Sequence, residues 1–263
     1  MSTRRDPRFA PSDGPRPHAP PRRTWYGPCK AALDFLLALA LLLLAAPLLL
    51  VLGVLVKLTS RGPVFYSQTR LGKRGRPFTV YKLRTMTHDC ERESGPQWSR
   101  PGDPRVTRLG RFLRKTHLDE LPQLWNVLRG DMSLVGPRPE RPEFFPSLEE
   151  ALPQYPSRLR VRPGVTGLAQ TLLPADTDLE SVRKKLSIDL HYVDNHGPWL
   201  DLRILIATPL LLLGLSPALL RRIFFLPAPA SPALRAQAAP APLPAAEIIA
   251  KVPALSLSSP GEA

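Results

Sequence analysis

The chain has 263 residues, and its 33 prolines are well above the share of about 5% that is usual in proteins. Lysine and arginine outnumber aspartate and glutamate by 36 to 22, which gives a formal net charge of +14 at pH 7. This charge favours anionic partners such as nucleic acid, acidic lipid or a phosphorylated substrate, without choosing among them. Two cysteines exclude a disulfide-rich scaffold and a four-thiolate metal site.

Both ends of the chain differ in composition from the middle. Residues 1–28 are rich in proline and arginine and have almost no aliphatic side chains, so they cannot offset the entropy lost on ordering. Residues 227–263 form a low-complexity stretch rich in alanine and proline. We therefore predict two disordered tails around a globular body and its flanking apolar segments.

The first apolar segment lies within residues 29–58. The 22 residues from Phe35 to Val56 carry no charge. As a helix, this run is long enough to cross a hydrocarbon core of about 30 Å. Pro47 removes a backbone hydrogen bond near the middle, so a kink is expected there. Basic residues flank both ends, and the positive-inside bias is met at both if the segment bends and re-emerges on its entry face. This favours a re-entrant helical hairpin facing the cytoplasm, with a single spanning helix as the alternative.

The second apolar segment, residues 204–226, is interrupted by prolines and a glycine and contains two adjacent arginines near its end. Its run of 17 uncharged residues is marginal for a span. Interfacial helices that lie on the membrane, with the arginines among lipid headgroups, fit this pattern better. The alternative is a core helix of the globular body.

Residues 59–203 predict a small globular domain of mixed structure. Aromatic and β-branched residues alternate with polar ones around a Gly-Lys-Arg-Gly turn, which indicates a short β-hairpin. Residues 104–115 place apolar side chains on one helical face and arginines on another, which indicates an amphipathic helix with a basic stripe. The predicted fold class is therefore mainly α with a small β-hairpin, an α+β domain joined to the re-entrant helix and the interfacial helices.

Two adjacent carboxylates, Asp119 and Glu120, follow this basic stripe. Apolar spacing in THLDELPQLWNVL predicts a second helix that starts near these residues, with Pro122 in its first turn. Carboxylates at a helix N-terminus often only cap the helix. However, phosphoryl transfer uses a carboxylate beside cations, because the cations neutralise phosphate oxygens while the carboxylate attacks phosphorus. Oxygen ligands and phosphate favour Mg²⁺ over zinc, for which no His/Cys cluster exists.

Two loops rich in glycine and proline, residues 130–140 and 161–170, complete the set of candidate features. Arg138, Arg160 and Arg162 lie in or beside them, so rigid turns could hold cations towards a phosphate. The alternative is a pair of ordinary surface turns. Neither loop matches a P-loop or a dinucleotide-binding glycine fingerprint, so ATP binding of those kinds is unsupported.

Several long motifs occur in an order similar to that of one protein family. They are an apolar segment with a central proline, then GPVFYSQTRLG, YKLRTM, DPRVTRLGRFLRKTHLDELPQLWNVLRGDMSLVGPRPE and VRPGVTGLAQ. From about Lys30 to Leu205 the chain resembles the bacterial sugar transferases, which are monotopic polyprenyl-phosphate phosphoglycosyl transferases. Larger relatives carry extra N-terminal membrane helices, so we expect the chain to resemble the short, minimal form.

The resemblance implies an activity and a location. Family members transfer a sugar 1-phosphate from a UDP-sugar to a polyprenyl phosphate such as undecaprenyl phosphate, release UMP and begin exopolysaccharide, O-antigen or glycan biosynthesis. The expected partners are therefore a UDP-sugar, a polyprenyl phosphate and membrane lipid, with no nucleic acid. The expected location is the bacterial inner membrane, with the catalytic domain on its cytoplasmic face.

The family's Asp-Glu pair matches Asp119 and Glu120. By that matching, Asp119 is the nucleophile that forms a covalent phosphosugar intermediate and also contacts Mg²⁺, with Glu120 in support. The same matching gives five residues that bind phosphate or nucleotide: Lys82, Arg114, Arg138, Arg160 and Arg162. Two positions depart from the family pattern, because Ala46 stands before Pro47 where serine is frequent, and His117 replaces another usual serine.

Two other classes of protein also fit the charge pattern. One is a basic, membrane-anchored adaptor that binds nucleic acid or acidic lipid without catalysis, although the chain lacks the aromatic and basic motifs of single-strand binders. The other is a bitopic Mg²⁺-dependent phosphohydrolase, in which water accepts the phosphoryl group. UMP release and product analysis separate these classes from a transferase.

Overall fold

The computed structural model describes residues 25–90, 102–174, 176 and 178–227. The predicted disordered tails lie almost entirely outside these residues. The described elements are, in chain order, α1 (Tyr26–Thr59), β1 (Phe65–Leu71), η2 (Lys73–Gly75), β2 (Pro77–Leu83), α2 (Arg108–Thr116), η3 (Leu118–Glu120), α3 (Gln123–Leu128), β3 (Ser133–Val135), α4 (Phe145–Ala151), η4 (Tyr155–Arg160), β4 (Gly164–Thr166), α5 (Leu168–Leu172), α6 (Leu179–Asn195), α7 (Pro198–Leu212) and α8 (Pro217–Ile223). The mainly helical fold with a small hairpin agrees with the predicted class.

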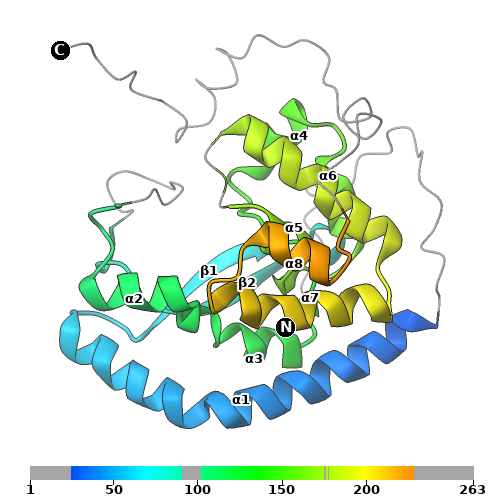
Figure 1. Ribbon diagram of the computed structural model, residues 1–263. Coiled ribbons are helices and arrows are strands. Elements are labelled where there is room, and N and C mark those ends of the chain that lie inside the picture. Colours follow the sequence, from blue (N-terminus) through cyan, green and yellow to red (C-terminus); the bar gives the residue numbers. More distant parts are fainter. Residues whose placement is uncertain (1–24, 91–101, 175, 177, 228–263) are drawn as a thin grey trace.

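α1 is one long helix that continues through Pro47. Figure 1 shows it as a curved helix along one side of the domain. Proline removes a single backbone hydrogen bond, and here the helix absorbs that loss as curvature instead of folding back into two arms. The predicted re-entrant hairpin is therefore not confirmed. By length and composition alone, α1 is long and apolar enough to cross a membrane.

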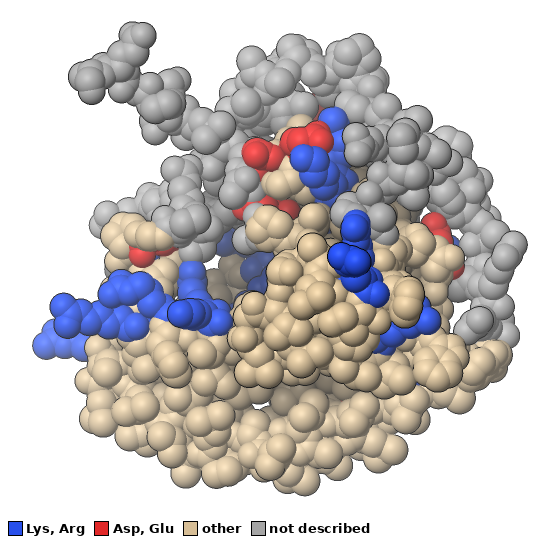
Figure 2. Space-filling view, in the orientation of Figure 1, with Lys and Arg blue, Asp and Glu red and all other residues tan. Residues whose placement is uncertain are grey.

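α1 lies against the rest of the domain near both of its ends. Ala38 is fully buried in the main core, while Leu52 and Val56 pack with Leu83 and Leu113 in a smaller core. The other side of the helix exposes many large apolar side chains. Figure 2 shows a broad uncharged surface below the clusters of charged side chains. Soluble proteins rarely expose so much contiguous apolar surface, so this surface suggests association with a membrane.

Polar contacts fix the first half of α1. The Asp34 carboxylate accepts a hydrogen bond from the Ser133 hydroxyl at 2.7 Å and another from the backbone N–H of Leu134 at 3.3 Å. Lys30 Nζ lies 2.6 Å from Asp201 Oδ2 on α7. A buried carboxylate in an apolar helix is costly unless it is paired, so these contacts set the position of α1 against β3 and α7.

The predicted β-hairpin is present as the antiparallel pair of β1 and β2, with Tyr66 opposite Lys82. The buried amide of Asn126, on α3, fixes this helix to the edge of β2. Its Nδ2 donates to the Thr79 carbonyl at 2.6 Å, and its Oδ1 accepts from the Tyr81 backbone N–H at 3.3 Å. The hairpin and the start of α3 are thereby held side by side, which brings η3 close to Lys82.

The two loops rich in glycine and proline form more than turns. They pair as short parallel strands, β3 and β4, with Ser133 opposite Gly164 and Val135 opposite Thr166. The backbones approach so closely that a Cβ built on Gly164 would lie 2.1 Å from the backbone nitrogen of Gly136. Glycine is required there for space, and the pairing sets the path of the loop that follows β3.

The predicted interfacial segment forms most of α7 and all of α8. Trp199 and Leu213 expose most of their surface, as does Phe225 just after α8. By contrast, Ile204 and Ala207 on α7 are fully buried in the main core. One face of α7 therefore packs in the core, while other parts of the segment present apolar surface outward. Their placement at a membrane interface stays a prediction.

Candidate active site

Asp119 and Glu120 lie on η3, between α2 and α3. His117 adopts the left-handed conformation, with φ of 54°, and so ends α2 and redirects the chain. The predicted helix start is a 3₁₀ turn, and the α-helix itself begins at Gln123, directly after Pro122. No helix N-terminus in the described part of the chain is capped by either carboxylate, and both side chains are buried. Simple helix capping is therefore not their role.

Both carboxylates line a cavity of about 680 Å³. Lys82 from β2, Arg114 from α2 and Arg138 from the loop after β3 line the same cavity. The fold thus brings together five of the residues that the sequence predicted for the site. The first and last of them, Lys82 and Arg138, are 56 positions apart in the sequence. The concentration of cations around a carboxylate pair is suited to a phosphorylated ligand.

The Glu120 carboxylate is fully engaged by two cations. Lys82 Nζ lies 2.6 Å from Oε1, and the Arg138 guanidinium donates to Oε2 at 3.2 Å and also to Oε1. Burial by itself would raise the pKa of Glu120, but Arg138 and Lys82 outweigh it and hold that pKa well below its usual range. Burial in turn lowers the pKa of Lys82, partly offset by Glu120. Glu120 is therefore an ionised anchor for these two cations.

Asp119 is different, although it is the next residue along the chain. Its carboxylate accepts no hydrogen bond from the residues that the structure describes. Burial raises the pKa of Asp119, an effect that Lys82 reduces and the neighbouring Glu120 charge reinforces. Asp119 is thus a buried acid with both oxygens available to a ligand in the cavity.

Arg138 is held in place from behind by a second set of charges. Its backbone carbonyl accepts a hydrogen bond at 2.9 Å from Arg158, which is ion-paired with Asp189 at 2.8 Å. Arg70 on β1 donates to the carbonyl of Pro139 at 3.2 Å. Arg114 is also oriented by a neighbour, because its Nε donates to the Thr85 hydroxyl at 2.8 Å. These contacts direct the cationic side chains into the cavity.

Two of the residues that the sequence predicted for the site lie elsewhere. Arg160 Nη1 lies 2.8 Å from Asp194 Oδ1 on α6, and Arg162 lies near Gly130. Neither arginine lines the cavity around Asp119. The structure therefore does not bring them to this cavity.

Arg84 is a cavity residue that the sequence interpretation did not assign. It lies two positions after Lys82, and side chains two positions apart share one face of an extended strand. That spacing could have identified it. Arg70 and Arg141 also line the cavity and add to its positive charge.

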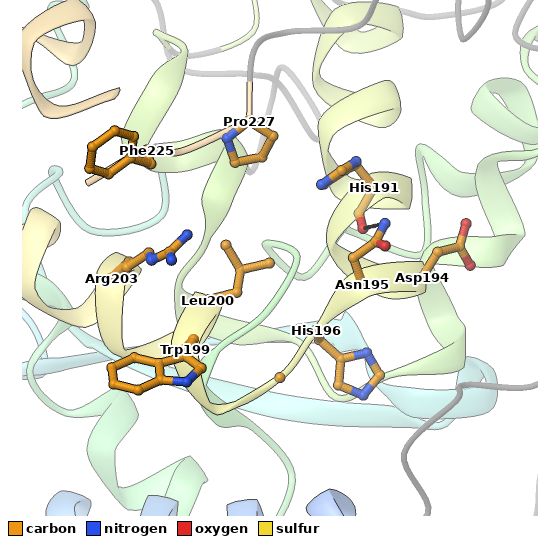
Figure 3. A pocket seen from close by; sticks show the side chains of 10 residues that line it. His191, Asp194, Asn195, His196, Trp199, Leu200, Arg203, Phe225 and Pro227 are labelled. Atoms are coloured by element: carbon orange, nitrogen blue, oxygen red, sulfur yellow. Dashed lines mark hydrogen bonds between the residues drawn. The ribbon is translucent and has the colours of Figure 1, made fainter. Parts of the chain in front are cut away.

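A second cavity of about 480 Å³ lies between the end of α6 and the start of α7 (Figure 3). His191 and Asn195 line one side of it, and Arg203 and Phe225 line another. The Asn195 amide donates to the backbone carbonyl of His191 at 2.9 Å, so part of this side is already hydrogen-bonded internally. None of the residues predicted for the site lines this cavity, and it shares no lining residue with the first.

Among the described residues there is no group of three or more His, Cys, Asp or Glu side chains that could hold a metal ion. Mg²⁺ is commonly held by one or two carboxylates together with substrate phosphates and water. Asp119, with its available oxygens in a cationic cavity, fits that mode of binding. It does not fit a metal site built from protein ligands alone.

A carboxylate of this kind, in a cationic cavity beside a long and largely apolar helix, is suited to an enzyme that handles phosphate esters. The family model for the bacterial sugar transferases matches residues 25–214. The chain belongs to this family, and the resemblance found in the sequence is confirmed.

Named relatives support the same assignment. The chain is 45% identical over 197 residues to the UDP-glucose:undecaprenyl-phosphate glucose-1-phosphate transferase of Caulobacter vibrioides, covering 73% of each protein. It is 43% identical over 183 residues to the UDP-N-acetylgalactosamine-undecaprenyl-phosphate N-acetylgalactosaminephosphotransferase of Aeromonas hydrophila, covering 70% of this chain. It is 44% identical over 184 residues to the exopolysaccharide production protein PSS of Rhizobium leguminosarum bv. phaseoli, covering 68% of this chain and 92% of the relative. The matched region is 43% of the length of the Aeromonas relative.

Proposed function

We propose that this protein transfers a sugar 1-phosphate from a UDP-sugar to a polyprenyl phosphate and releases UMP. Family membership and the activities in the relatives' names support the substrates, which in two of those names are a UDP-sugar and undecaprenyl phosphate. One observation supports the mechanism above all. Of two adjacent buried carboxylates, Glu120 is neutralised by two cations, whereas Asp119 accepts no hydrogen bond from the described residues.

In the first step of the proposed reaction, an Asp119 oxygen attacks the phosphorus atom that is bonded to the sugar oxygen. The bond from that phosphorus to the bridging oxygen breaks, UMP leaves, and an aspartyl phosphosugar remains. In the second step, a phosphate oxygen of the polyprenyl phosphate attacks the same phosphorus. The bond to Asp119 breaks, which regenerates the carboxylate and yields the sugar on a polyprenyl diphosphate.

The cations around Asp119 suit both steps of this reaction. Two anionic substrates occupy one site in turn, so they do not repel each other in it, and each meets the positive charge of Lys82, Arg114 and Arg138. Glu120 keeps two of these cations in place. Asp119 would also hold Mg²⁺ together with the substrate phosphates, and the ion would neutralise charge on the diphosphate.

We also propose that α1 lies within one leaflet, with the catalytic domain on the cytoplasmic face of the bacterial inner membrane. α1 contacts the same domain through Lys30 near its start and Val56 near its end. A helix attached at both ends to one side of a domain cannot carry its two ends to opposite sides of a bilayer. Basic residues at both ends also satisfy the positive-inside bias.

The replacement Asp119→Asn tests the mechanism. It removes the nucleophile with little change in shape, so we expect UMP release to fall to background while the protein still sediments with membranes. Wild-type protein incubated with labelled UDP-sugar and no acceptor should carry the label on Asp119, detected by mass spectrometry of peptides. Asp131→Asn, which changes a surface acid paired with Arg129, is the matched control and should retain activity. Substantial transfer by Asp119→Asn would exclude Asp119 as nucleophile.

The donor is identified by a panel of UDP-sugars assayed with undecaprenyl phosphate for UMP production. UDP-glucose and UDP-N-acetylgalactosamine come first, because the relatives' names contain them. Acceptor-dependent UMP release with one of these donors supports the transferase. Release of UMP together with free sugar phosphate would favour a hydrolase, and absence of UMP release with every donor would favour a non-catalytic adaptor.

A further inference from the structure

Arg84 is a buried cation without a counter-charge. The residue exposes 5% of its surface and lines the cavity that contains Asp119. Its Nε and Nη1 atoms are buried and have no hydrogen-bond partner, and none of the ion pairs in the described part of the chain involves it. A buried charge that is neither paired nor hydrogen-bonded costs stability, so a residue of this kind is suited to an anionic ligand.

The third nitrogen of Arg84 fixes the direction of the guanidinium. Nη2 donates to both the backbone carbonyl and the hydroxyl of Ser60 at 2.8 Å. Ser60 is the C-cap of α1, directly after its last residue, Thr59. These two contacts place the unpartnered nitrogens of Arg84 where the chain passes from the apolar helix α1 to the β-hairpin.

Gly62 gives this guanidinium its space. With φ of 114°, Gly62 is in a conformation that favours glycine, and a Cβ at this position would lie 2.3 Å from Arg84 Nη1. The same Cβ would lie 2.8 Å from the ring of His88, so this ring lies beside Arg84 at the cavity wall. The His88 side chain is 48% exposed, and its rotation is the movement that would admit a ligand to Nη1.

We propose that Arg84 binds the phosphate group of the polyprenyl phosphate acceptor through Nη1. The inference rests on the proposed function and adds to it the residue that receives the lipid substrate. A guanidinium N–H group donates a strong, charge-assisted hydrogen bond to a phosphate oxygen. The attachment to the end of α1 favours the lipid phosphate over the diphosphate of the sugar nucleotide, because a lipid phosphate stays at the membrane boundary.

Measuring the two half-reactions separately shows whether Arg84 binds the lipid phosphate or the diphosphate of the sugar nucleotide. In the first, wild-type protein and variants react with labelled UDP-sugar without acceptor, and label on the protein is measured. In the second, undecaprenyl phosphate is added, and the KM for this lipid is determined. For Arg84→Gln we expect first-step labelling within about twofold of wild type. The KM for undecaprenyl phosphate should rise by about tenfold or more, because a hydrogen bond from a charged donor is lost.

Additional variants separate binding from folding. Arg84→Lys keeps the charge but loses the planar guanidinium that Ser60 orients, so it should restore less than half of the lost affinity for the lipid. Ser60→Ala removes one contact that orients the guanidinium, and it should raise the same KM by a smaller factor. Arg129→Gln alters a surface arginine and should leave both half-reactions unchanged. Melting temperatures in detergent establish that each variant is folded.

A readout independent of turnover completes the test. Native mass spectrometry in nanodiscs compares the binding of undecaprenyl phosphate and undecaprenol, and Arg84→Gln should abolish the preference for the phosphate. Equal loss in both half-reactions by folded variants, or an unchanged KM for the lipid with an unchanged preference, would overturn the proposal. Failure of the wild-type protein to use any UDP-sugar would instead contradict the proposed function. In that case the comparison of lipid binding would still test whether Arg84 binds the phosphate of the lipid.

Discussion

At the scale of single residues, Asp119 and Glu120 show how neighbouring carboxylates acquire opposite properties. Burial affects both, but only Glu120 gains hydrogen bonds from Lys82 and Arg138. The folded protein therefore raises the pKa of Asp119 and depresses that of Glu120. An acid whose pKa is raised on folding binds its proton more tightly in the native state, so its ionisation at higher pH costs stability.

This difference predicts stability effects of opposite sign in the ligand-free protein. At pH 7, Asp119→Asn should raise the melting temperature, because it removes a buried charge, and Glu120→Gln should lower it, because it leaves two cations without their counter-charge. The Asp119→Asn effect should vanish below about pH 4, where aspartate is protonated in both states. The Glu120→Gln effect should persist above about pH 4.3 and decrease as the pH falls through the depressed pKa. Thermal unfolding in detergent across this pH range is the measurement, and a melting temperature lowered by Asp119→Asn at pH 7 would contradict the argument.

At the scale of elements, the loop after β3 has a fixed position because buried charges on neighbouring elements contact it. Arg158 on η4 pairs with Asp189 on α6 and donates to the carbonyl of Arg138. Both charged side chains of the pair are almost fully buried. Removing one member of such a pair leaves the other buried and uncompensated, which costs much more than losing a surface pair.

We therefore expect Asp189→Ala to destabilise the protein by about 3–5 kcal/mol. Asp194→Ala, which breaks the more exposed pair with Arg160 on the same helix, should cost about 0–1 kcal/mol and serves as the matched control. Denaturant unfolding in a mild detergent measures both. Equal effects of the two replacements would show that the Arg158 pair is not effectively buried.

At the scale of the whole molecule, the path of α1 determines the membrane topology of the protein. Cys29 lies near the start of α1 and is exposed, and Cys90 lies in the catalytic domain beyond its end. If α1 lies within one leaflet, both thiols are on one face of the membrane. An impermeant thiol reagent should therefore label both from the same side of sealed vesicles, with permeabilised vesicles and single Cys→Ser variants as controls. Labelling from opposite sides would establish a spanning helix, even if the chemistry at Asp119 were correct.

The sequence by itself determined the main elements and the family of this protein. The long apolar run, the hairpin around its glycine turn, and the carboxylate pair after a basic stripe are local patterns, because periodicity and composition act over a few residues. These patterns were sufficient to single out Asp119 and Glu120, whereas Lys82 was found by matching the family motif. They were also sufficient to recognise the family from the order of its motifs.

Only the tertiary structure decided which cations reach the carboxylates and how α1 lies. Arg138 reaches the site and Arg160 does not, because pairing of β3 with β4 and the contacts of Arg158 set the path of each loop. Pro47 bends α1 without folding it back, since contacts near both ends keep the helix along the domain. Long-range contacts of this kind join residues far apart in the chain, and no local pattern of residues encodes them.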